Sequence, residues 1–202
     1  MPQHFDTSEL NPQQVYQLLT HSVQPRPIAW ISTLDQAGTP NLAPYSFFTV
    51  ASVEPPVLAY SQVTPRTLAD KDTLANLRAG GDCVVNLVTR AQAEVMNASC
   101  AALPHGQSEF DHAGVAPIPS RHVAAPGVAG SPLRIECRLR QVVPIGDGPM
   151  SGSLVLLDVV AFSVDDAVLE GGLPCPVRLD AVGKLGGDGY STTRDRFELA
   201  RP

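Results

Sequence analysis

The stretch PNLAPYSFFTVASVEPP, residues 40–56, puts polar and apolar side chains in an order that an ordinary half-buried strand would not have. Such a strand alternates between the two kinds, whereas this one holds an amide, a tyrosine, a serine and two phenylalanines among its prolines. Asn41, Tyr45 and Ser46 carry hydrogen-bonding groups among residues that otherwise favour burial. We interpret the stretch as a strand edge that faces a flat, half-polar ligand.

Strand patterns extend from this stretch in both directions. Residues 26–50 predict two strands around a turn that contains Asp35 and Gly38, a hairpin with a longer loop. Further strands are predicted at 56–62, 83–89, 132–145 and 153–164, the last two joined by the turn GDGPMSG. Strands therefore outnumber helices, and the regular spacing of turns favours a mainly β barrel with minor α content.

Three short helices are predicted beside these strands. The first, at 11–20, opens with Asn, Pro and Gln in the order of a capped helix start. The second runs from Thr73 to Ala79, capped by Asp72 or Thr73 in front and by Gly80 behind. The third runs from Ala91 to about Ala101. Residues 104–132 predict a long surface excursion, and without a repeat or linker the chain is one domain, 1–202.

Composition excludes several classes of protein. The 202 residues are 44% hydrophobic and 17% charged, as in globular proteins, and the formal net charge of −6 argues against a duplex nucleic-acid surface. No apolar run approaches the roughly 18 residues that span a bilayer, and the first ten residues do not resemble a secretory signal. We expect a cytoplasmic protein without nucleic-acid or membrane partners. The four cysteines have no metal-site spacing, and Cys83 and Cys137 read as small buried hydrophobes.

The segment ADKDTLANL, residues 69–77, is a candidate for binding an anion. Lys71, Asp72 and Thr73 place a cation, a hydroxyl and free backbone N–H groups at the mouth of a helix, where the helix dipole also favours negative charge. Arg66 lies a few residues upstream and could reach the same point with a bidentate phosphate contact. The alternative is an ordinary capped helix beside a solvated lysine.

Polar residues on the two strands of the predicted hairpin form a second candidate. They could offer hydrogen bonds to a planar heterocycle, while two small or flat neighbours leave room for a ring to lie close. The polar residues are Ser32, Thr33, Asn41 and Ser46, and the neighbours are Ala43 and Pro44. The alternative is that these side chains bond one another across the strands and merely satisfy the sheet.

No catalytic side chain stands out. The five histidines fall in loop-like segments without a helical partner for a metal, so no metal site is predicted. The glycines of GKLGGDGY do not follow a strand in the spacing of a dinucleotide-binding loop. Glu109 and Asp111 in SEFD read as loop and turn chemistry, not as a catalytic pair.

Taken in order, several segments carry a resemblance to a known family. The run VQPRPIAWISTLDQAGTPNLAPYSFFTVASVEPPVLAYS, followed by KDTLANL, CVVNLV, SEFDHAGV and SPLRIECRL, resembles the flavin reductase-like family of FMN-binding split barrels, which includes flavoredoxin. The match covers roughly residues 20–190. It implies a six-stranded split β-barrel of Greek-key character with short helices, assembled as a homodimer with FMN at the interface.

The resemblance also assigns roles to the two candidate segments. The flavin-edge residues would be Ser32, Thr33, Asn41, Ala43, Pro44 and Ser46, and the phosphate end would be Lys71, Asp72 and Thr73, with Arg66 nearby. It implies an oxidoreductase that reduces flavin with NADH or NADPH and could supply it to a separate monooxygenase, with the nicotinamide stacking in the opening left by the excursion at 104–132. The alternatives are an FMN electron carrier reduced by a protein partner and a flavin-binding module without catalysis.

Two positions depart from the family pattern. Many members carry a histidine or other polar residue near the position of Ser163, where a nicotinamide contact would lie. Many members also read arginine where VGKLGG has Lys184, a change that keeps the charge but loses the planar fork.

Overall fold

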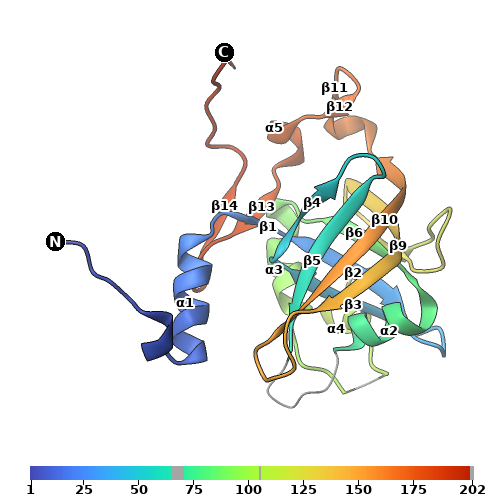
Figure 1. Cartoon of the computed structure of the whole chain (residues 1–202). Helices are drawn as coiled ribbons and strands as arrows, with labels where there is room; N and C mark the ends of the chain where they lie inside the picture. Colours follow the sequence, from blue (N-terminus) through green and yellow to red (C-terminus); the bar gives the residue numbers. More distant parts are fainter. Residues whose placement is uncertain (65–70, 105, 201–202) are drawn as a thin grey trace.

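One antiparallel sheet of seven strands curves into a barrel that forms the body of the fold (Figure 1). The structure is a computed structural model that describes residues 1–64, 71–104 and 106–200. Its strand order is β3-β2-β6-β9-β10-β5-β4. The strands are β2 (Ala29–Leu34), β3 (Pro40–Tyr45), β4 (Phe48–Ser52), β5 (Val57–Val63), β6 (Asp82–Leu87), β9 (Leu133–Pro144) and β10 (Gly152–Val164). The prediction of a mainly β split barrel is confirmed.

The strand predicted at 40–50 divides in two. β3 ends at Tyr45, β4 begins at Phe48, and the two pair with different neighbours, β2 and β5. The main sheet therefore has seven strands, where six were predicted, because Ser46 and Phe47 turn the chain from one side of the barrel to the other. We call this bend, residues 45–48, the β3–β4 corner.

The three predicted helices are present as α1, α2 and α3, and two short helices that were not predicted, α4 and α5, accompany them. They are α1 (Pro12–Ser22), α2 (Asp72–Gly80), α3 (Ala93–Ala98), α4 (Glu109–Ala113) and α5 (Pro176–Leu179), with single turns η1 (Thr7–Glu9), η2 (Arg90–Gln92) and η3 (Asp166–Val168). Asn11 and Gln14 form the reciprocal cap expected for α1. The caps predicted for α2 are wrong: Lys71 holds the N-cap position, and Gly81, in the left-handed conformation, ends the helix.

Two apolar cores lie on the two faces of the curved sheet. The inner core fills the barrel and includes Ile31, Tyr60, Leu74 and Leu157. The outer core lies around Trp30 and includes residues of α3, α4 and the excursion, among them Met96, Phe110 and Val128. The excursion at 104–132 is thus only partly a surface segment, because it supplies buried side chains to the outer core.

The inner core also contains the two cysteines predicted to be buried. Cys83 of β6 lies directly opposite Cys137 of β9, and neither is exposed to solvent. A hydrogen bond with Cys137, together with burial, raises the pKa of the Cys83 thiol well above its usual range, so the thiol stays neutral. Both cysteines pack as small hydrophobes, as predicted.

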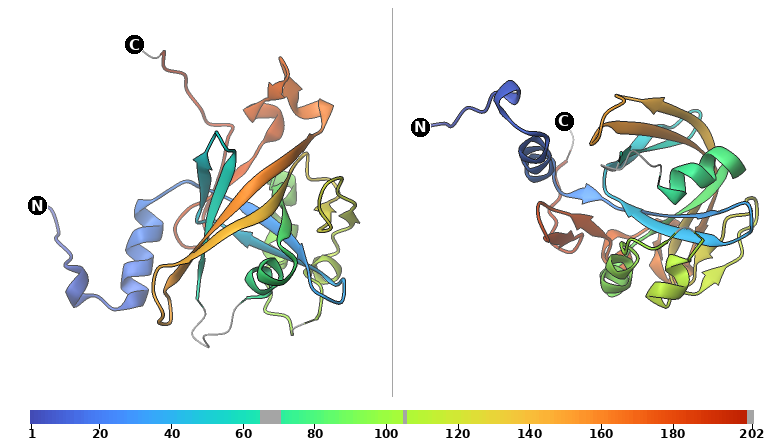
Figure 2. Two further views of the ribbon diagram at one scale, coloured as in Figure 1. Left: turned by 45° about the vertical axis from the view of Figure 1, so that its right-hand side comes forward. Right: turned by 90° about the horizontal axis from the view of Figure 1, so that it is seen from below.

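Three small sheets complete the fold. β1 (Arg26–Pro27), β13 (Val182–Lys184) and β14 (Tyr190–Thr192) form one of them, in the order β1-β13-β14. The two others are the pairs β7 (Pro117–Ile118) with β8 (Gly127–Val128) and β11 (Leu169–Glu170) with β12 (Leu173–Pro174). The first sheet lies between α1 and the barrel, and α1 stands away from the barrel in all three ribbon views (Figures 1 and 2). Within the described ranges, no helix is long and apolar enough to cross a membrane.

Candidate functional site

The β3–β4 corner is held in place by an arginine that the sequence reasoning missed. Arg26 is buried, and its Nε donates to Ser46 Oγ at 3.4 Å while its guanidinium lies 5.9 Å from the centre of the Phe47 ring. From the other side, the backbone N–H of Ser61 in β5 donates to the Phe47 carbonyl oxygen at 2.7 Å. The corner is therefore anchored on both sides, although Ser46 and Phe47 at its centre belong to no strand.

The remaining donors of Arg26 bind backbone carbonyls from distant segments. One terminal nitrogen donates to the carbonyls of Thr20 and Val23, at the end of α1, at 2.5 and 2.7 Å. The other donates to the Leu185 carbonyl at 3.0 Å, just after β13. A single guanidinium thus ties the N-terminal helix, the C-terminal hairpin and the β3–β4 corner together. The PRP context of Arg26 gave no sign of these long-range partners.

The start of α2 lies beside the same corner. Lys71 is exposed, and its ammonium nitrogen is 5.8 Å from the centre of the Tyr45 ring, at the end of β3. No side chain caps this helix among the described residues. The first backbone N–H groups of a helix have no acceptor within the helix, and the helix dipole adds a partial positive charge there. The start of α2 therefore offers an anion the Lys71 ammonium group and the positive end of the helix dipole.

Four predicted ligand residues have their side chains engaged inside the protein. Asn41 Oδ1 accepts from the hydroxyls of Thr33 at 3.3 Å and Thr73 at 2.8 Å, and its amide nitrogen donates to Glu109 at 2.8 Å. Ser32 donates to the carbonyl of Pro126 at 2.5 Å. The Thr33–Asn41 bond is the cross-strand alternative considered for the hairpin, whereas the other bonds join the hairpin to segments outside it. All four residues are buried.

Ser32 and Thr33 also lie on opposite faces of β2. Thr33 faces inward, toward Asn41 and α2, and accepts from the amide of Asn76 at 3.0 Å. Ser32 faces outward, beneath the excursion, because side chains alternate along a strand. The two hydroxyls therefore do not converge on one surface.

The other predicted residues are half-buried or exposed, except Arg66, whose position the structure does not describe. Ala43, Pro44, Ser46 and Asp72 are half-buried, and Lys71 is exposed. Arg66 lies outside the described residues. Two places are therefore left to face a ligand. One is the β3–β4 corner with the end of β3, and the other is the start of α2.

Glu109 is a second residue whose role the sequence reasoning missed. It was interpreted as loop chemistry, but it is buried, and one carboxylate oxygen accepts from the amide of Asn41 at 2.8 Å and the backbone N–H of Leu42 at 3.0 Å. It therefore fixes the start of β3 from outside the barrel. A serine followed by acidic residues, as in SEFD, was a signal for a helix start, and α4 does begin there, with Ser108 at the N-cap position and Glu109 and Asp111 in the first turn.

Two tyrosine rings pack against each other in the barrel behind the corner, tilted by 50°. The rings of Tyr45 and Tyr60 lie 4.7 Å apart, and Tyr45 donates its hydroxyl to Gln62 at 3.1 Å. Burial is the main cause that raises the pKa of both phenols. Both therefore remain neutral, so Lys71 faces a neutral ring and not a phenolate.

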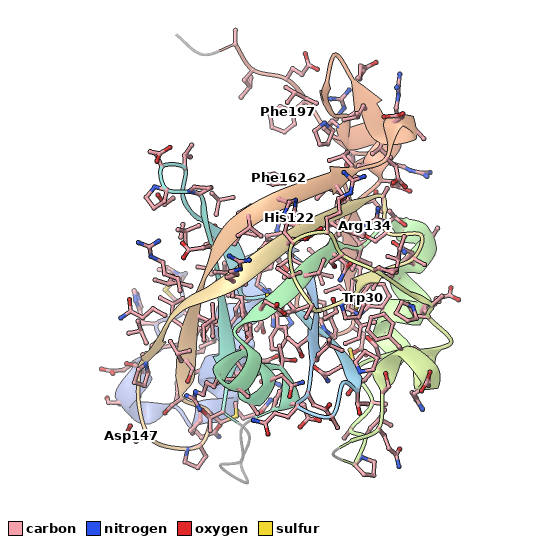
Figure 3. The ribbon with its side chains drawn as sticks, turned by 90° about the vertical axis from the view of Figure 1, so that its right-hand side faces the viewer. Trp30, His122, Arg134, Asp147, Phe162 and Phe197 are labelled. Atoms are coloured by element: carbon pink, nitrogen blue, oxygen red, sulfur yellow. The ribbon has the colours of Figure 1, made fainter. Side chains whose placement is uncertain are left out.

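The excursion is fastened to the outer face of the barrel beyond this site. Glu136 accepts from the backbone N–H groups of Arg121 and His122 at 3.0 and 2.6 Å, and Asn86 accepts from Val128 N–H at 2.8 Å. A cavity of about 440 Å³ lies between the excursion and β9–β10 and includes Ser163 in its wall. Figure 3 shows Phe162, His122 and Arg134 toward one end of this hairpin, far from Asp147 at its turn.

The geometry fits a ligand with an anionic end and a flat, partly polar body. Lys71 and the start of α2 suit the anion, and Tyr45 connects them directly to the corner that carries Ser46. Of the two small or flat neighbours, Ala43 packs against the inner core, and Pro44, which follows it in β3, is half-buried. FMN has both parts, a phosphate at one end and an isoalloxazine ring at the other, and the residues present fit it.

Known proteins match the chain along most of its length. An uncharacterized protein of Deinococcus radiodurans is 40% identical over 206 residues, which cover 98% of this chain and 89% of that one. Among solved structures, nitrilotriacetate monooxygenase component B from Bacillus cereus is 31% identical with a TM-score of 0.93, covering 98% of this chain and 99% of its own. The 2-nitrobenzoate 2-nitroreductase of Pseudomonas fluorescens is 31% identical with a TM-score of 0.87, covering 99% and 96%.

The family itself follows from a match to a sequence model. The model described as the flavin reductase like domain matches residues 21–177, which include β1 to β12, the β3–β4 corner and the start of α2. With the split-barrel fold and this match over most of the chain, the protein belongs to the flavin reductase-like family.

Proposed function

We propose that this protein is an FMN-dependent oxidoreductase that takes electrons from NADH or NADPH and supplies reduced flavin to a separate acceptor, such as a monooxygenase. The observation that carries the proposal is the position of Lys71. Its ammonium group lies at the start of α2, which no side chain caps, and against Tyr45, so a cation and the positive end of a helix dipole adjoin the β3–β4 corner. A phosphate and a flat ring in one ligand would use both features.

The chain's own residues would bind and orient the cofactor. Lys71 and the first N–H groups of α2 would hold the phosphate. The backbone of the corner, with Ala43, Pro44 and Ser46, would contact the edge of the ring. When bound, the flavin supplies the capacity to accept a hydride, which requires no acidic or basic side chain from the protein. The buried neutral tyrosines behind the corner keep water and charge away from that side.

The comparisons support redox chemistry at this site. The two solved relatives at 31% identity are named as a monooxygenase component and a nitroreductase. The first name supports a reductase that serves a monooxygenase. The second name supports the transfer of electrons to an acceptor.

We also propose that the protein is a homodimer with FMN between the subunits. Several large apolar side chains are exposed on the barrel, among them Val50, Val160 and Phe162, of which Phe162 is 63% exposed. Burial of such side chains against a second copy would remove them from water.

The visible spectrum of the purified protein tests the proposed function. We expect flavin bands, either as isolated or after FMN is added, that bleach without oxygen when NADH or NADPH is supplied. Bands that persist with both nicotinamides but bleach with a protein reductase would replace the reductase by an electron carrier. Bands that persist with every donor would leave a flavin-binding module, and a protein that binds no FMN would overturn the site.

A further inference from the structure

A second cavity, of about 720 Å³, lies between α3 and the β13–β14 hairpin. Its walls come from two separate parts of the chain, residues 90–100 on one side and 182–192 on the other. The volume lies within the range of small-molecule sites. Nothing in the proposed flavin contacts uses this cavity, so its lining needs an explanation of its own.

The two walls are joined by direct contacts. Thr89 bridges to Ala181, Arg90 N–H donates to the Asp180 carbonyl at 2.9 Å, and the Tyr190 hydroxyl donates to Asn97 Oδ1 at 3.4 Å. These bonds fix the separation of the walls without a ligand. The cavity is therefore preformed, as small-molecule sites usually are.

The cavity presents two cations of different character. Lys184 donates to the carbonyls of Gly187 and Gly189, and its ammonium lies 4.3 Å from the centre of the Tyr190 ring. An ammonium has three N–H groups, so one remains for a ligand. Arg90 is exposed, and its side chain makes no hydrogen bond or ion pair with the part of the chain that the structure describes.

The remaining lining supplies partners for a nucleoside. Ala93 and Val182 give an apolar surface and Tyr190 an aromatic ring, which suit a planar base. Glu94 and Asp188 give exposed carboxylates, which accept hydrogen bonds from ribose hydroxyls in nucleotide sites. With the two cations for a phosphate, each part of a nucleotide has a matching group.

The cavity adjoins the proposed flavin site. Lys184 pairs with Arg26 across β1 and β13, and Arg26 in turn donates to Ser46 in the β3–β4 corner. On the other side, Cys100 lines the cavity, and its thiol is within electrostatic reach of both Lys71 and Lys184. Burial raises the pKa of that thiol, and the two ammonium groups oppose the rise.

We infer that this cavity binds the adenosine-phosphate part of a nucleotide. That part is common to FAD and to the nicotinamide donors. Lys184 and Arg90 would meet the phosphates, while Glu94 or Asp188 would meet the ribose. The inference rests on the proposed function, because the two nucleotides it considers are a flavin cofactor and the nicotinamide that reduces it.

Calorimetric binding of AMP to the FMN-loaded protein tests the inference directly. We expect wild type to bind AMP and Arg90→Ala to bind it about tenfold more weakly, since a charge-assisted contact is lost. Arg90→Ala removes no side-chain hydrogen bond or ion pair of the described residues, so we expect this variant to fold as wild type does. Lys184→Met, which also removes two carbonyl contacts, is the second variant. Arg140→Ala, whose arginine pairs with Asp158 outside the cavity, is the matched control.

Two further measurements separate the sources of the adenosine phosphate. If it belongs to FAD, Arg90→Ala weakens FAD binding while FMN binding stays within about twofold. If it belongs to the donor, Arg90→Ala raises the KM for NADH or NADPH while kcat and FMN binding hold. Either result supports the cavity as the site.

The inference is overturned if wild type fails to bind AMP, or if Arg90→Ala and Lys184→Met bind AMP, FAD and the donors as wild type does. In that case FMN binding and nicotinamide oxidation by wild type would still stand. Loss of FMN binding in wild type would instead contradict the proposed function, so the two failures are distinguishable.

Discussion

At the scale of single residues, two tyrosines that pack against each other differ in whether their hydroxyl groups are hydrogen-bonded. Tyr45 donates to Gln62, whereas the buried Tyr60 hydroxyl has no partner among the described residues. A buried polar group without a partner costs free energy, so Tyr60→Phe is expected to leave the free energy of unfolding unchanged or raise it, by up to about 1 kcal/mol. Tyr45→Phe is the matched control and should lower it by about 1 kcal/mol. Urea denaturation measures both, and a larger loss for Tyr60→Phe would contradict this account.

Glu109 offers a second test of a single buried group. Glu109→Ala leaves the amide of Asn41 and the N–H of Leu42 without their acceptor, and we expect a loss of about 1–3 kcal/mol in the free energy of unfolding. Glu109→Gln keeps one side-chain oxygen as acceptor and should lose less. Denaturant titration of the two variants decides the matter. Equal losses would show that the bonds to β3 contribute little.

At the scale of elements, the contribution of the β2–β3 turn to the free energy of unfolding depends on pH. Asp35 accepts from the backbone N–H groups of Thr39 and Ala37 at 2.7 and 2.8 Å, and the Thr39 bond is the main cause that lowers the pKa of this carboxyl. A lowered pKa in the folded state means that the stabilisation is present above about pH 4 and is lost as pH falls through the folded pKa.

Asp35→Asn should therefore be less stable than wild type at neutral pH, and the difference should shrink as the pH falls below about 4. Thermal unfolding across this range measures it. A difference between the two proteins that does not change with pH would contradict the role of the ionised carboxylate.

Two residues at the start of α2 allow effects on FMN binding to be distinguished from effects on stability. Lys71→Ala removes an exposed cation, and we expect it to weaken FMN binding about tenfold, with little effect on the free energy of unfolding. Thr73→Val removes a buried hydroxyl that donates to Asn41 and should mainly destabilise the fold. Flavin fluorescence titration and urea denaturation on both variants test this. Unchanged FMN affinity in Lys71→Ala would overturn the placement of the phosphate.

At the scale of the whole molecule, the proposed dimer predicts linked assembly and cofactor binding. Light scattering should give twice the chain mass of 21.4 kDa. Phe162→Glu places a charge on an exposed apolar surface and should shift the protein toward the monomer if that surface is an interface. If FMN lies between the subunits, the affinity for FMN should fall as the fraction of dimer falls. A monomer that binds FMN as tightly as wild type would contradict the shared site.

Local patterns in the sequence were enough to define the barrel. The hairpin around Asp35 and Gly38, the capped start of α1 and the long apolar strands 132–145 and 153–164 all recur in the structure near their predicted positions. These features depend on side-chain periodicity and on turn and cap chemistry within a few residues. The order of the segments also carried the family resemblance, which the match over residues 21–177 confirms.

Long-range packing decided which polar residues could face a ligand. Ser32, Thr33, Asn41 and Thr73 were candidates by type, but three of them bond one another and Ser32 bonds the excursion. Their partners lie up to 94 residues away in the chain, so no local pattern could reveal them. The same holds for Arg26 and its bond to the carbonyl of Leu185, 159 residues along the chain.

The sequence by itself determined the β-rich fold, the family and the two segments that could hold a flavin, because each depends on residues close together in the chain. Only the tertiary structure decided which side chains remain free. A hydrogen-bonding group buried away from water needs a partner, and the barrel supplies partners from distant segments. What it leaves exposed is Lys71 beside the β3–β4 corner, and the cavity that Arg90 and Lys184 line.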